Sequence, residues 1–438
     1  MSASNRVFWR CLPMVVVAAI GIAIPKAGSA TTWQATETAP AQQEEKQQEK
    51  KQQESDEVQK KRLVENPYDF SKPPEIPEVE VPSSLEIRQA MDRGIEFLVG
   101  CQRETGAWGA ATNTKDLNIY APIPGAHDGF RMATTSLCIT ALLKPDQGDN
   151  EKVGPCIDKA EAWLMEHLPA LKRATGDAIY NCWAHTYSID ALLALRQREG
   201  ITDEKRAKLD ELVESQLKML DTYESVDGGW GYYDFRYQGR KPTSESTSFL
   251  NGASLICMYN AQQAGFTINE KTVQRAIDAT VRQQKPDYTY LYGEYMKNSP
   301  MQGINRPGGS LGRTQCCNAA LRIWGDEKID DNVLKHWLVR LYVRNGWLDM
   351  GRKRPIPHES WMGVAGYFYY FGHYYGAISL ELLPAEERAP FQGLVGKLML
   401  DRQEANGSWW DYPLYDYHQQ YGTAYALLTL DRCLPVKK

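Results

Sequence analysis

The side chains best able to transfer protons gather at two places in this sequence. Asp411, Asp416 and His418 stand close together near the end of the chain, and Glu359 precedes an aromatic-rich segment. Two carboxyl groups that face each other across a bond are what glycoside hydrolysis needs, one as the acid and one as its partner. Carboxylates in loops are more often simply solvated. We therefore treat Asp411, Asp416, His418 and Glu359 as catalytic candidates, with solvated surface groups as the alternative.

A second group of residues is suited to line a ligand cavity. These residues stand in or just before segments that resemble buried helices, and the run from 367 to 375 is mostly Tyr and Phe. Aromatic rings can stack on sugars or enclose an apolar chain, although ordinary core packing explains such a run equally well. The predicted lining residues are His127, Asp128, Arg131, Trp183, His185, Tyr187, Trp361, Tyr367, His373 and Tyr421.

Metal and cofactor motifs are scarce. Cys182 and His185 lie three residues apart and could reach one ion from a single helix face, but a tetrahedral zinc site needs further ligands. No Cys-x-x-Cys pair and no phosphate-binding glycine loop occurs in the sequence. Apart from Cys11, most cysteines stand in apolar helical stretches, where a free thiol packs as a small hydrophobe. We predict no metal, no cofactor and mostly buried free thiols.

The composition limits the class of protein and of partner. The chain has 438 residues, of which 42% are hydrophobic and 24% charged, and its formal net charge is −5. This charge gives no electrostatic reason to expect nucleic acid as a partner. The 12 Trp and 24 Tyr supply material for a large core. These values are typical of a globular protein and exclude a collagen-like or fully disordered chain.

The first thirty residues predict a secretory signal. Arg6 and Arg10 form a basic start, an apolar run from 12 to 24 follows, and small residues precede Thr31. This order is typical of a cleaved signal peptide, and the run is shorter than the roughly 20 residues that span a bilayer. We expect an exported protein, periplasmic or extracellular, with retention at the membrane by an uncleaved signal as the alternative.

Residues 31–82 predict a tether rather than a folded unit. Between 34 and 62 the chain consists largely of Gln, Glu and Lys, and it cannot bury enough apolar surface to offset the entropy of ordering. The five prolines between 67 and 82 then favour a stiff, extended spacer. We expect the folded domain to occupy 83–438.

Beyond residue 83 the apolar residues follow the spacing of helices. Ile87, Met91, Ile95 and Leu98 lie on one helix face, and similar amphipathic segments recur along the chain. Between them lie segments that are apolar on every side, and such helices must be buried. We count six pairs, at about 85–143, 155–198, 203–264, 268–325, 329–382 and 386–432.

This alternation of amphipathic and wholly apolar helices predicts an outer and an inner layer. A repeat of about 50 residues is typical of stacked or closed arrays. The last pair is as apolar as the middle ones, and neither end carries a polar capping repeat, which favours a closed ring over an open solenoid. We predict an all-α fold, an (α/α)6 toroid of six helical hairpins in two concentric layers.

The turns between helices carry a recurring motif. Residues 102–109 and 403–410 both contain Gln-x-x-x-Gly-x-Trp, residues 227–231 give a third copy with a longer lead from Gln216, and 345–347 give a degenerate fourth. Glycine supplies the left-handed backbone that ends a helix. Glutamine can bond free backbone groups there, and tryptophan covers that contact. We interpret the motif as a structural clamp between repeats.

On this motif and the helix-pair repeat, which cover 85–432, the chain resembles the prenyltransferase and squalene-oxidase repeat superfamily of terpenoid cyclases and protein prenyltransferase β subunits. Residues 421–428 are similar to the closing helix of squalene-cyclase-like secreted bacterial repeat proteins. The resemblance implies an α-α toroid with a central, largely apolar cavity. The Asp-x-Asp-Asp acid of such cyclases is missing. The nearest run ends in Asp330 and Asp331, which we expect at a helix start.

Three functions stay open on this basis. The first is an exported, cyclase-like or prenyltransferase-like toroid that binds an apolar, isoprenoid-type or extended small molecule in an aromatic-lined cavity, with its catalytic activity unassigned. The second is a carbohydrate-active (α/α)6 barrel, a hydrolase or lyase, which takes a glycan and needs two carboxylates about 5 to 10 Å apart. The third is a non-catalytic envelope scaffold in peripheral contact with the membrane or envelope, whose ring would be plugged by side chains.

Overall fold

The computed structural model describes residues 69–114, 125–144, 151–243, 246–359 and 362–435. The predicted signal peptide, residues 1–30, and the predicted tether as far as residue 68 lie outside the described residues, and so does Trp361. Within the described ranges, no helix is long and apolar enough to cross a membrane.

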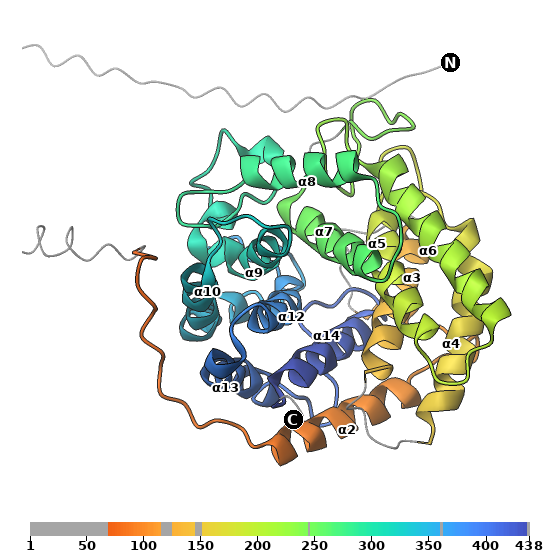
Figure 1. The fold of residues 1–438 in the computed structure, drawn as a ribbon, viewed down its shortest axis with the longest axis horizontal. Helices are drawn as coiled ribbons and strands as arrows, with labels where there is room; N and C mark the ends of the chain where they lie inside the picture. Colours follow the sequence, from red (N-terminus) through yellow and green to blue (C-terminus); the bar gives the residue numbers. More distant parts are fainter. Residues whose placement is uncertain (1–68, 115–124, 145–150, 244–245, 360–361, 436–438) are drawn as a thin grey trace, which may run out of the picture. The chain divides into compact units, whose positions relative to one another are not determined.

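The described helices form two layers (Figure 1). The outer layer consists of α2 (Ser84–Gly100), α4 (Val153–His167), α6 (Asp203–Tyr223), α8 (Glu270–Arg282), α10 (Asp331–Val343) and α13 (Arg388–Leu400). The inner layer consists of α3 (Ala126–Leu142), α5 (Asn181–Arg196), α7 (Ser248–Gln263), α9 (Pro307–Ile323), α12 (Phe368–Glu381) and α14 (His418–Cys433). The short α11 (Asn345–Asp349) and four 3-10 turns, η1 (Leu168–Ala170), η2 (Glu294–Met296), η3 (Gly303–Asn305) and η4 (Ala385–Glu387), complete the described helices.

The inner helices close into a ring. Each one contacts the next in chain order, from α3 through α5, α7, α9 and α12 to α14, and α14 in turn contacts α3. Each outer helix packs against the inner helix that precedes it around the ring, as α4 does on α3 and α6 on α5, and α2 packs against α14. The predicted all-α, two-layered toroid of six hairpins is therefore confirmed, and the open solenoid is excluded.

Burial follows the two kinds of helix that the sequence distinguishes. In α12 every residue except Glu381 is buried, whereas α8 buries Val273 and Ala276 and exposes Lys271 and Asp278. Small hydroxyl residues join neighbouring inner helices, as in the 3.0 Å hydrogen bond between the hydroxyls of Ser136 and Ser188. A helix apolar on all sides can be stable only inside the outer layer.

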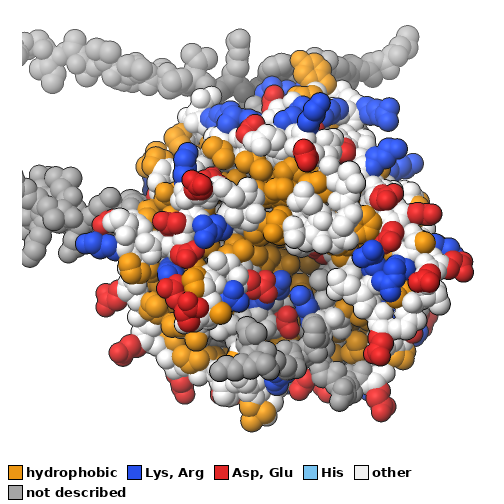
Figure 2. Space-filling model, in the orientation of Figure 1, with side chains coloured by type: hydrophobic (Ala, Val, Ile, Leu, Met, Phe, Trp, Pro, Cys, Tyr) orange, Lys and Arg blue, Asp and Glu red, His pale blue; other side chains and the backbone are white. Residues whose placement is uncertain are grey.

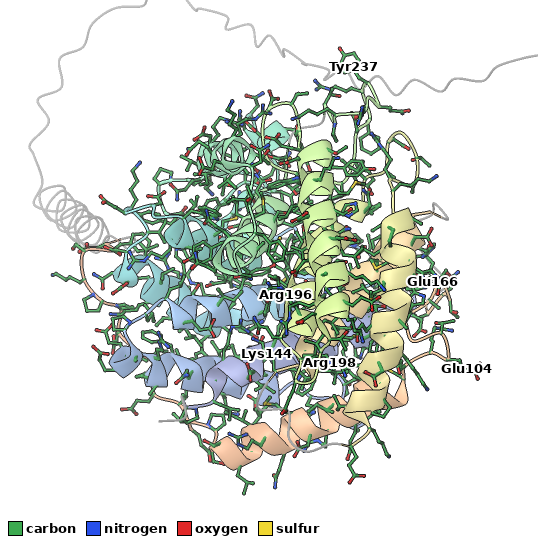
Figure 3. All side chains as sticks on the ribbon, turned by 45° about the vertical axis from the view of Figure 1, so that its right-hand side comes forward. Glu104, Lys144, Glu166, Arg196, Arg198 and Tyr237 are labelled. Carbon is green, nitrogen blue, oxygen red and sulfur yellow. The ribbon has the colours of Figure 1, made fainter. Side chains whose placement is uncertain are left out.

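Charged residues at the end of α5 attach the inner layer to the outer one. Arg196 Nε lies 2.5 Å from Asp210 Oδ1 on α6, and Arg198 Nη1 lies 2.8 Å from Glu161 Oε2 on α4. Figure 3 labels both arginines, together with Glu104 and Glu166 at the periphery. Glu161 is buried, so its charge must be paired.

The glutamine–glycine–tryptophan motif forms the predicted clamp. Gln102 Nε2 donates to the carbonyl of Cys156 on α4 at 2.8 Å, and Gln403 Nε2 donates to the carbonyl of Ala90 on α2 at the same distance. Trp108 Nε1 donates to the carbonyl of Leu98 at the end of its own outer helix. Each clamp therefore joins one repeat to the next, and Gln403 joins the last repeat to the first.

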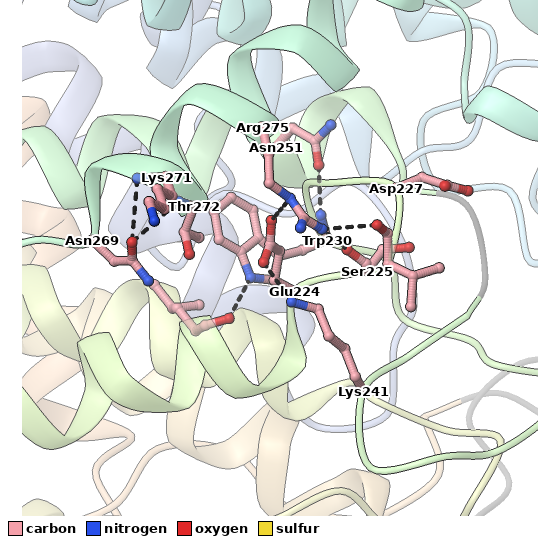
Figure 4. Close-up of polar contacts among 12 residues, drawn as sticks. Glu224, Ser225, Asp227, Trp230, Lys241, Asn251, Asn269, Lys271, Thr272 and Arg275 are labelled. Atoms are coloured by element: carbon pink, nitrogen blue, oxygen red, sulfur yellow. Dashed lines mark hydrogen bonds and ion pairs between the residues drawn. The ribbon is translucent and has the colours of Figure 1, made fainter.

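The third clamp uses an ion pair in place of the glutamine amide (Figure 4). The predicted lead residue Gln216 does not take part, because its Oε1 accepts from His185 Nδ1 instead. Glu224 occupies the position of the glutamine, with Oε1 2.8 Å from Arg275 Nε on α8. Trp230 Nε1 donates to the carbonyl of Leu220, as in the other copies.

The fourth clamp lies in a segment that the sequence motif does not identify. The predicted copy at 345–347 begins α11, and its glycine has no close neighbours. The same turn of backbone hydrogen bonds occurs instead at Lys285, Tyr288 and Thr289. Tyr288 adopts a φ of 60° where the other copies have glycine, and the fully buried Tyr290 takes the place of tryptophan.

The ordered packing begins before the predicted boundary at residue 83. Phe70 makes edge-to-face contacts with Tyr288 and His336, at ring-centroid distances of 4.9 and 5.0 Å. His336 Nε2 hydrogen-bonds to the carbonyl of Lys72. The predicted cap holds as expected, since Asp330 accepts from the Val333 backbone at the start of α10. All eight cysteines in the described ranges are free, and all but Cys101 are buried.

Candidate functional site

The ring encloses a cavity of about 890 Å3. Its walls come from the N-terminal halves of α3, α5, α7, α12 and α14 and from the loops that lead into the inner helices. Figure 2 shows hydrophobic side chains reaching the surface near the centre of the ring, with charged side chains concentrated around its periphery. The scaffold hypothesis required a filled centre, which this cavity excludes.

Aromatic side chains dominate the cavity lining. Of the 29 residues that line the cavity, 16 are Phe, Tyr or Trp, and Asp177 is the one carboxylate among the lining residues that the structure describes. Phe249 is central to the wall, with its ring 5.9 Å from Trp183 and 5.0 Å from Phe368. These stacked and edge-to-face contacts fix the rings in place before any ligand binds.

Two tyrosines in the lining bond to each other across the ring. The hydroxyls of Tyr187 on α5 and Tyr425 on α14 lie 2.5 Å apart, although α3 separates these two helices in the ring. Both side chains line the cavity and are otherwise buried. This hydrogen bond across the ring forms a polar element in an otherwise apolar wall.

A chain of hydroxyl groups in the lining ends at a histidine. Tyr367 hydroxyl lies 2.9 Å from His358 Nε2 and 3.2 Å from Tyr292 hydroxyl, which in turn hydrogen-bonds to Tyr232 hydroxyl. His358 Nδ1 lies 2.7 Å from the carbonyl oxygen of Gly363. Burial of His358 lowers its pKa, the Gly363 hydrogen bond partly offsets this, and the charge of Arg313 lowers it further. His358 is therefore held in its neutral form.

Arg313 is a fully buried cation beside this wall. Its guanidinium donates to the carbonyls of Tyr290 and Gly309, and its carbon centre lies 5.7 Å from the ring of Tyr292 and 5.8 Å from that of Phe368. Burial lowers the pKa of Arg313 to about 10, so it stays charged at neutral pH. Backbone carbonyls and ring faces thus supply the compensation for this buried charge.

Asp411 lies behind the lining rather than in it. Its Oδ1 accepts from the hydroxyl of Tyr421, a lining residue, at 2.7 Å, and its Oδ2 accepts from the Tyr370 backbone at 3.1 Å. Burial raises the pKa of Asp411 to about 7, against the lowering effect of these hydrogen bonds and of Arg352. The carboxyl can therefore exchange a proton near neutral pH, one tyrosine away from the cavity.

The raised pKa of Asp411 predicts a pH-dependent contribution to stability. Between about pH 4 and pH 7 the folded chain keeps a proton on this carboxyl that the unfolded chain loses, so its contribution falls as the pH rises. Replacing Asp411 with Asn removes the titration. We expect the stability advantage of the wild type over Asp411→Asn, measured by urea unfolding, to shrink by roughly 2–4 kcal/mol from pH 4 to pH 8. Parallel pH profiles for the two proteins would contradict this role.

The other three catalytic candidates do not line the cavity. Asp416 forms a 2.9 Å ion pair with Arg103, His418 Nδ1 hydrogen-bonds to the carbonyl of Tyr415 at 2.7 Å, and Glu359 is exposed. Asp411 and Asp416 form local contacts outside the lining. The described lining residues therefore do not include two carboxylates that face each other.

Of the predicted lining residues, Trp183, Tyr187, Tyr367 and Tyr421 do line the cavity. His127, Asp128 and Arg131 are placed elsewhere. His127 Nδ1 lies 3.2 Å from the Tyr417 hydroxyl, Arg131 interacts with the same tyrosine, and Asp128 is exposed. Phe130 and Ala133 reach the cavity from the same helix, α3, and the ring of His127 contacts that of Phe130 at a centroid distance of 6.2 Å.

His185 and His373 stand within the helix layers, which corrects their placement at the cavity. His185 Nδ1 lies 2.6 Å from Gln216 Oε1, and His373 Nδ1 lies 2.6 Å from the Tyr369 carbonyl. In each case an asparagine amide lies close to Nε2, Asn181 for His185 and Asn345 for His373. Burial lowers both pKa values to about 4. Both imidazoles are neutral, hydrogen-bonded structural groups.

Two short patterns in the sequence prove to be structural. Residues 308–312 fit Gly-x-Ser-x-Gly, but Ser310 lies inside α9 and donates to the Arg306 carbonyl, rather than in the strand-to-helix turn of a nucleophile elbow. Asp431 and Cys433 fit the Asp-x-Cys pattern of zinc sites. His418, at the other end of α14, is about 20 Å away along the helix axis. In the described ranges, no group of three potential ligands could hold a metal ion.

Sequence reasoning omitted several lining residues from its candidates, His358 among them. The catalytic candidates named from the sequence include Glu359 but not its neighbour His358. In the structure the backbone at His358 has a φ of 61°. Such a conformation is rare for a residue other than glycine and is frequent at functional sites. Tyr232 and Tyr292 follow positions that correspond to the clamp tryptophan, two residues after Trp230 and Tyr290. The position two residues after the clamp aromatic is therefore a sequence signal for the lining residues Tyr232 and Tyr292.

Comparison with known proteins identifies one family and several solved structures of similar fold. A model of the squalene-hopene cyclase C-terminal domain matches residues 75–299, and no curated protein matches the chain. The type II terpene cyclase MstE from Scytonema is 12% identical, with 80% of this chain and 98% of that chain covered and a TM-score of 0.44.

Two further solved structures are carbohydrate enzymes by their descriptions. The GH76A α-1,6-mannanase from Salegentibacter sp. HEL1_6 is 10% identical, covers 79% of this chain and 98% of its own, and has a TM-score of 0.48. The unsaturated glucuronyl hydrolase from Streptococcus agalactiae is 13% identical, with 82% and 97% covered and a TM-score of 0.49. At such low identity these structures carry no statement about the activity of this chain.

Proposed function

Because this chain belongs to the family of squalene-hopene cyclase C-terminal domains, we propose that its central cavity binds an apolar small molecule of isoprenoid type. The observation that supports this proposal is the lining, in which 16 of 29 residues are aromatic and one described residue is a carboxylate. Ring faces and edges offer favourable contacts to methyl groups and double bonds along the whole length of such a ligand.

The size of the cavity suits this ligand class. Sites for small molecules commonly measure about 300–1,000 Å3, and this cavity lies in that range at about 890 Å3. Each buried methylene contributes about 0.8 kcal/mol, so an isoprenoid of about 15 carbons gains micromolar affinity even after the cost of immobilisation. Affinity would thus come mainly from apolar burial, and the few polar groups would set orientation.

The proposal is limited to binding. An isolated alkene needs a strong, preorganised acid, and the chain lacks the Asp-x-Asp-Asp run. Asp411, a buried carboxyl beside the lining, has a pKa of about 7 and contacts the lining residue Tyr421. Such a pair is suited to hydrogen bonding at an oxygen atom. It is too weak an acid to protonate a carbon–carbon double bond.

A glycan is the alternative ligand, and the arrangement of acids disfavours its hydrolysis. Glycoside hydrolysis uses two carboxyl groups on opposite sides of the bond. Asp411 lies behind Tyr421 and Asp416 is paired with Arg103, which leaves Asp177 in the described lining. Aromatic rings alone would still stack on sugars, so glycan binding without hydrolysis remains a distinct outcome of the test.

Mass spectrometry of co-purifying molecules tests the proposal. We also propose export, on the basis of residues 1–30, so the protein is purified from the envelope fraction with its N-terminus expected at Thr31. Organic extraction of the purified protein should release an isoprenoid lipid in about one molar equivalent. Recovery of a glycan, or of no molecule from protein that also fails to bind added isoprenoids, would contradict the proposal.

A further inference from the structure

We infer that the cavity selects a ligand with a hydrogen-bond-donating head group, an apolar alcohol, and that His358 imposes this preference through a chain of tyrosine hydroxyls. This inference rests on the proposed function, because it assumes an apolar ligand in the same cavity. It adds the chemistry of the polar end of that ligand, which the aromatic lining does not determine.

The position of one proton is fixed by the Gly363 carbonyl. His358 Nδ1 lies 2.7 Å from that oxygen, and a carbonyl oxygen can only accept, so Nδ1 carries the hydrogen. A neutral imidazole has one N–H group, which leaves Nε2 as an acceptor. Tyr367 hydroxyl, 2.9 Å from Nε2, must therefore donate to it.

The same reasoning orients the next two hydroxyls. The Tyr367 hydrogen is used by His358, so Tyr292 donates to the Tyr367 oxygen across 3.2 Å. The Tyr292 hydrogen is then used as well, so Tyr232 donates to the Tyr292 oxygen. A hydroxyl has one hydrogen and two lone pairs. The hydroxyl hydrogens of Tyr232, Tyr292 and Tyr367 therefore all point along this row of hydrogen bonds towards His358.

Burial of His358 and the charge of Arg313 keep His358 neutral, and this maintains the direction of the tyrosine hydrogen bonds. His358 is mostly buried, and the fully buried Arg313 guanidinium, stacked near Tyr292 and Phe368, adds a positive charge on the same side. A second positive charge on His358 would therefore be unfavourable. Arg313 itself donates to backbone carbonyls, and among the described residues no carboxylate lies within hydrogen-bond distance of its guanidinium.

The resulting surface offers acceptors to a ligand. Tyr232, Tyr292 and Tyr367 line the cavity, and Tyr292 and Tyr367 each have one lone pair left after the bonds described. On the neighbouring wall, Tyr421 also uses its hydrogen internally, on Asp411 Oδ1. An alcohol can donate to these oxygens, whereas an ether or ester oxygen would face other acceptors and lose its hydration without replacement.

The experiment compares two probes of nearly equal shape and apolar area, farnesol and farnesyl methyl ether. Equilibrium dialysis at pH 8 measures both dissociation constants for the wild type and for Tyr367→Phe. We expect the wild type to bind farnesol at least about tenfold more tightly than the ether. In Tyr367→Phe the dissociation constants of the two probes should differ by no more than about threefold. The affinity for the ether should be unchanged or increased.

Two further variants separate this effect from a general loss of structure. Tyr370→Phe removes a nearby buried hydroxyl that has no hydrogen-bond partner and does not line the cavity, so both affinities should stay unchanged. His358→Asn removes the Nε2 acceptor while keeping a residue that tolerates a φ of 61°, and it should lower the ratio as Tyr367→Phe does. Thermal unfolding checks that each variant is folded.

The outcomes distinguish this inference from the proposed function. Equal binding of both probes by the wild type, or an unchanged ratio in folded Tyr367→Phe and His358→Asn, would overturn the inference and leave apolar binding intact. Binding of neither probe would overturn the proposed function and the inference together. A lower ratio in Tyr370→Phe as well would show that the preference does not arise from the hydroxyl chain.

Discussion

Ala133→Trp should abolish ligand binding while leaving the fold intact. Ala133 lies on α3 in the cavity lining, so a tryptophan there projects an indole ring into the space that the ligand would occupy. Loss of contact with about four methylene groups corresponds to roughly 3 kcal/mol. We expect the affinity for farnesol, measured by equilibrium dialysis, to fall by at least about hundredfold.

Val343→Trp is the matched control for this change. Val343 ends the outer helix α10 and is 61% exposed, so the same side chain is added on the outer layer. Farnesol affinity should remain within about twofold of the wild type. If folded Ala133→Trp bound farnesol as tightly as Val343→Trp, the ligand would have to bind outside the ring.

Gly228→Ala should unfold the protein or destabilise it severely. Gly228 has a φ of 93°, and a Cβ atom there would lie 2.4 Å from the carbonyl oxygen of Arg275 on α8. That contact cannot be relieved by a side-chain rotation, because the opposing atom belongs to the backbone of the next outer helix. We expect a loss of at least about 3 kcal/mol in the free energy of unfolding, measured by urea titration.

Gly265→Ala separates backbone strain from this close contact. Gly265 has the same φ of 93°, but no heavy atom lies within 4 Å of the added Cβ. Its alanine variant should therefore lose only about 1 kcal/mol. Equal destabilisation of the two variants would mean that the contact between the clamp loop at Gly228 and α8 contributes nothing, and the clamp interpretation would be wrong.

The architecture could be predicted from the sequence because it depends on long, repeated patterns. The faces of the outer helices and the all-apolar inner helices differ along many residues, so errors at single positions cancel. The cap at Asp330 and the clamps at Trp108 and Trp409 were also local enough to identify. In each, the donor and acceptor groups belong to one turn and its nearest helix.

The candidate site was harder to predict, because it depends on side-chain direction. Glu359 and His358 are neighbours, and the backbone conformation at His358 decides which of them faces the cavity. His185 and His373 begin or enter inner helices as expected, but asparagine and carbonyl partners on other turns hold them within the wall. One partner of each histidine, Gln216 for His185 and Asn345 for His373, is about 30 residues away in the sequence and cannot be inferred from spacing.

The fourth clamp shows a second limit of sequence patterns. In the fourth clamp, which begins at Gln284, Tyr288 stands at the glycine position with a φ of 60°. Tyr290 stands at the tryptophan position, and its hydroxyl donates to Asn318. The backbone turn is kept although both signature residues have changed. Asn345 and Gly346 matched the motif better by letter, yet the chain there continues into α11.

The most direct test of apolar binding at the centre of the ring is a crystal structure with a bromine-labelled farnesol. The bromine can be located by its anomalous signal without prior assumptions about the site. The account predicts one strong peak inside the ring, among Trp183, Phe249 and Phe371. A peak only on the outer surface, or none inside the ring at saturating concentration, would contradict it.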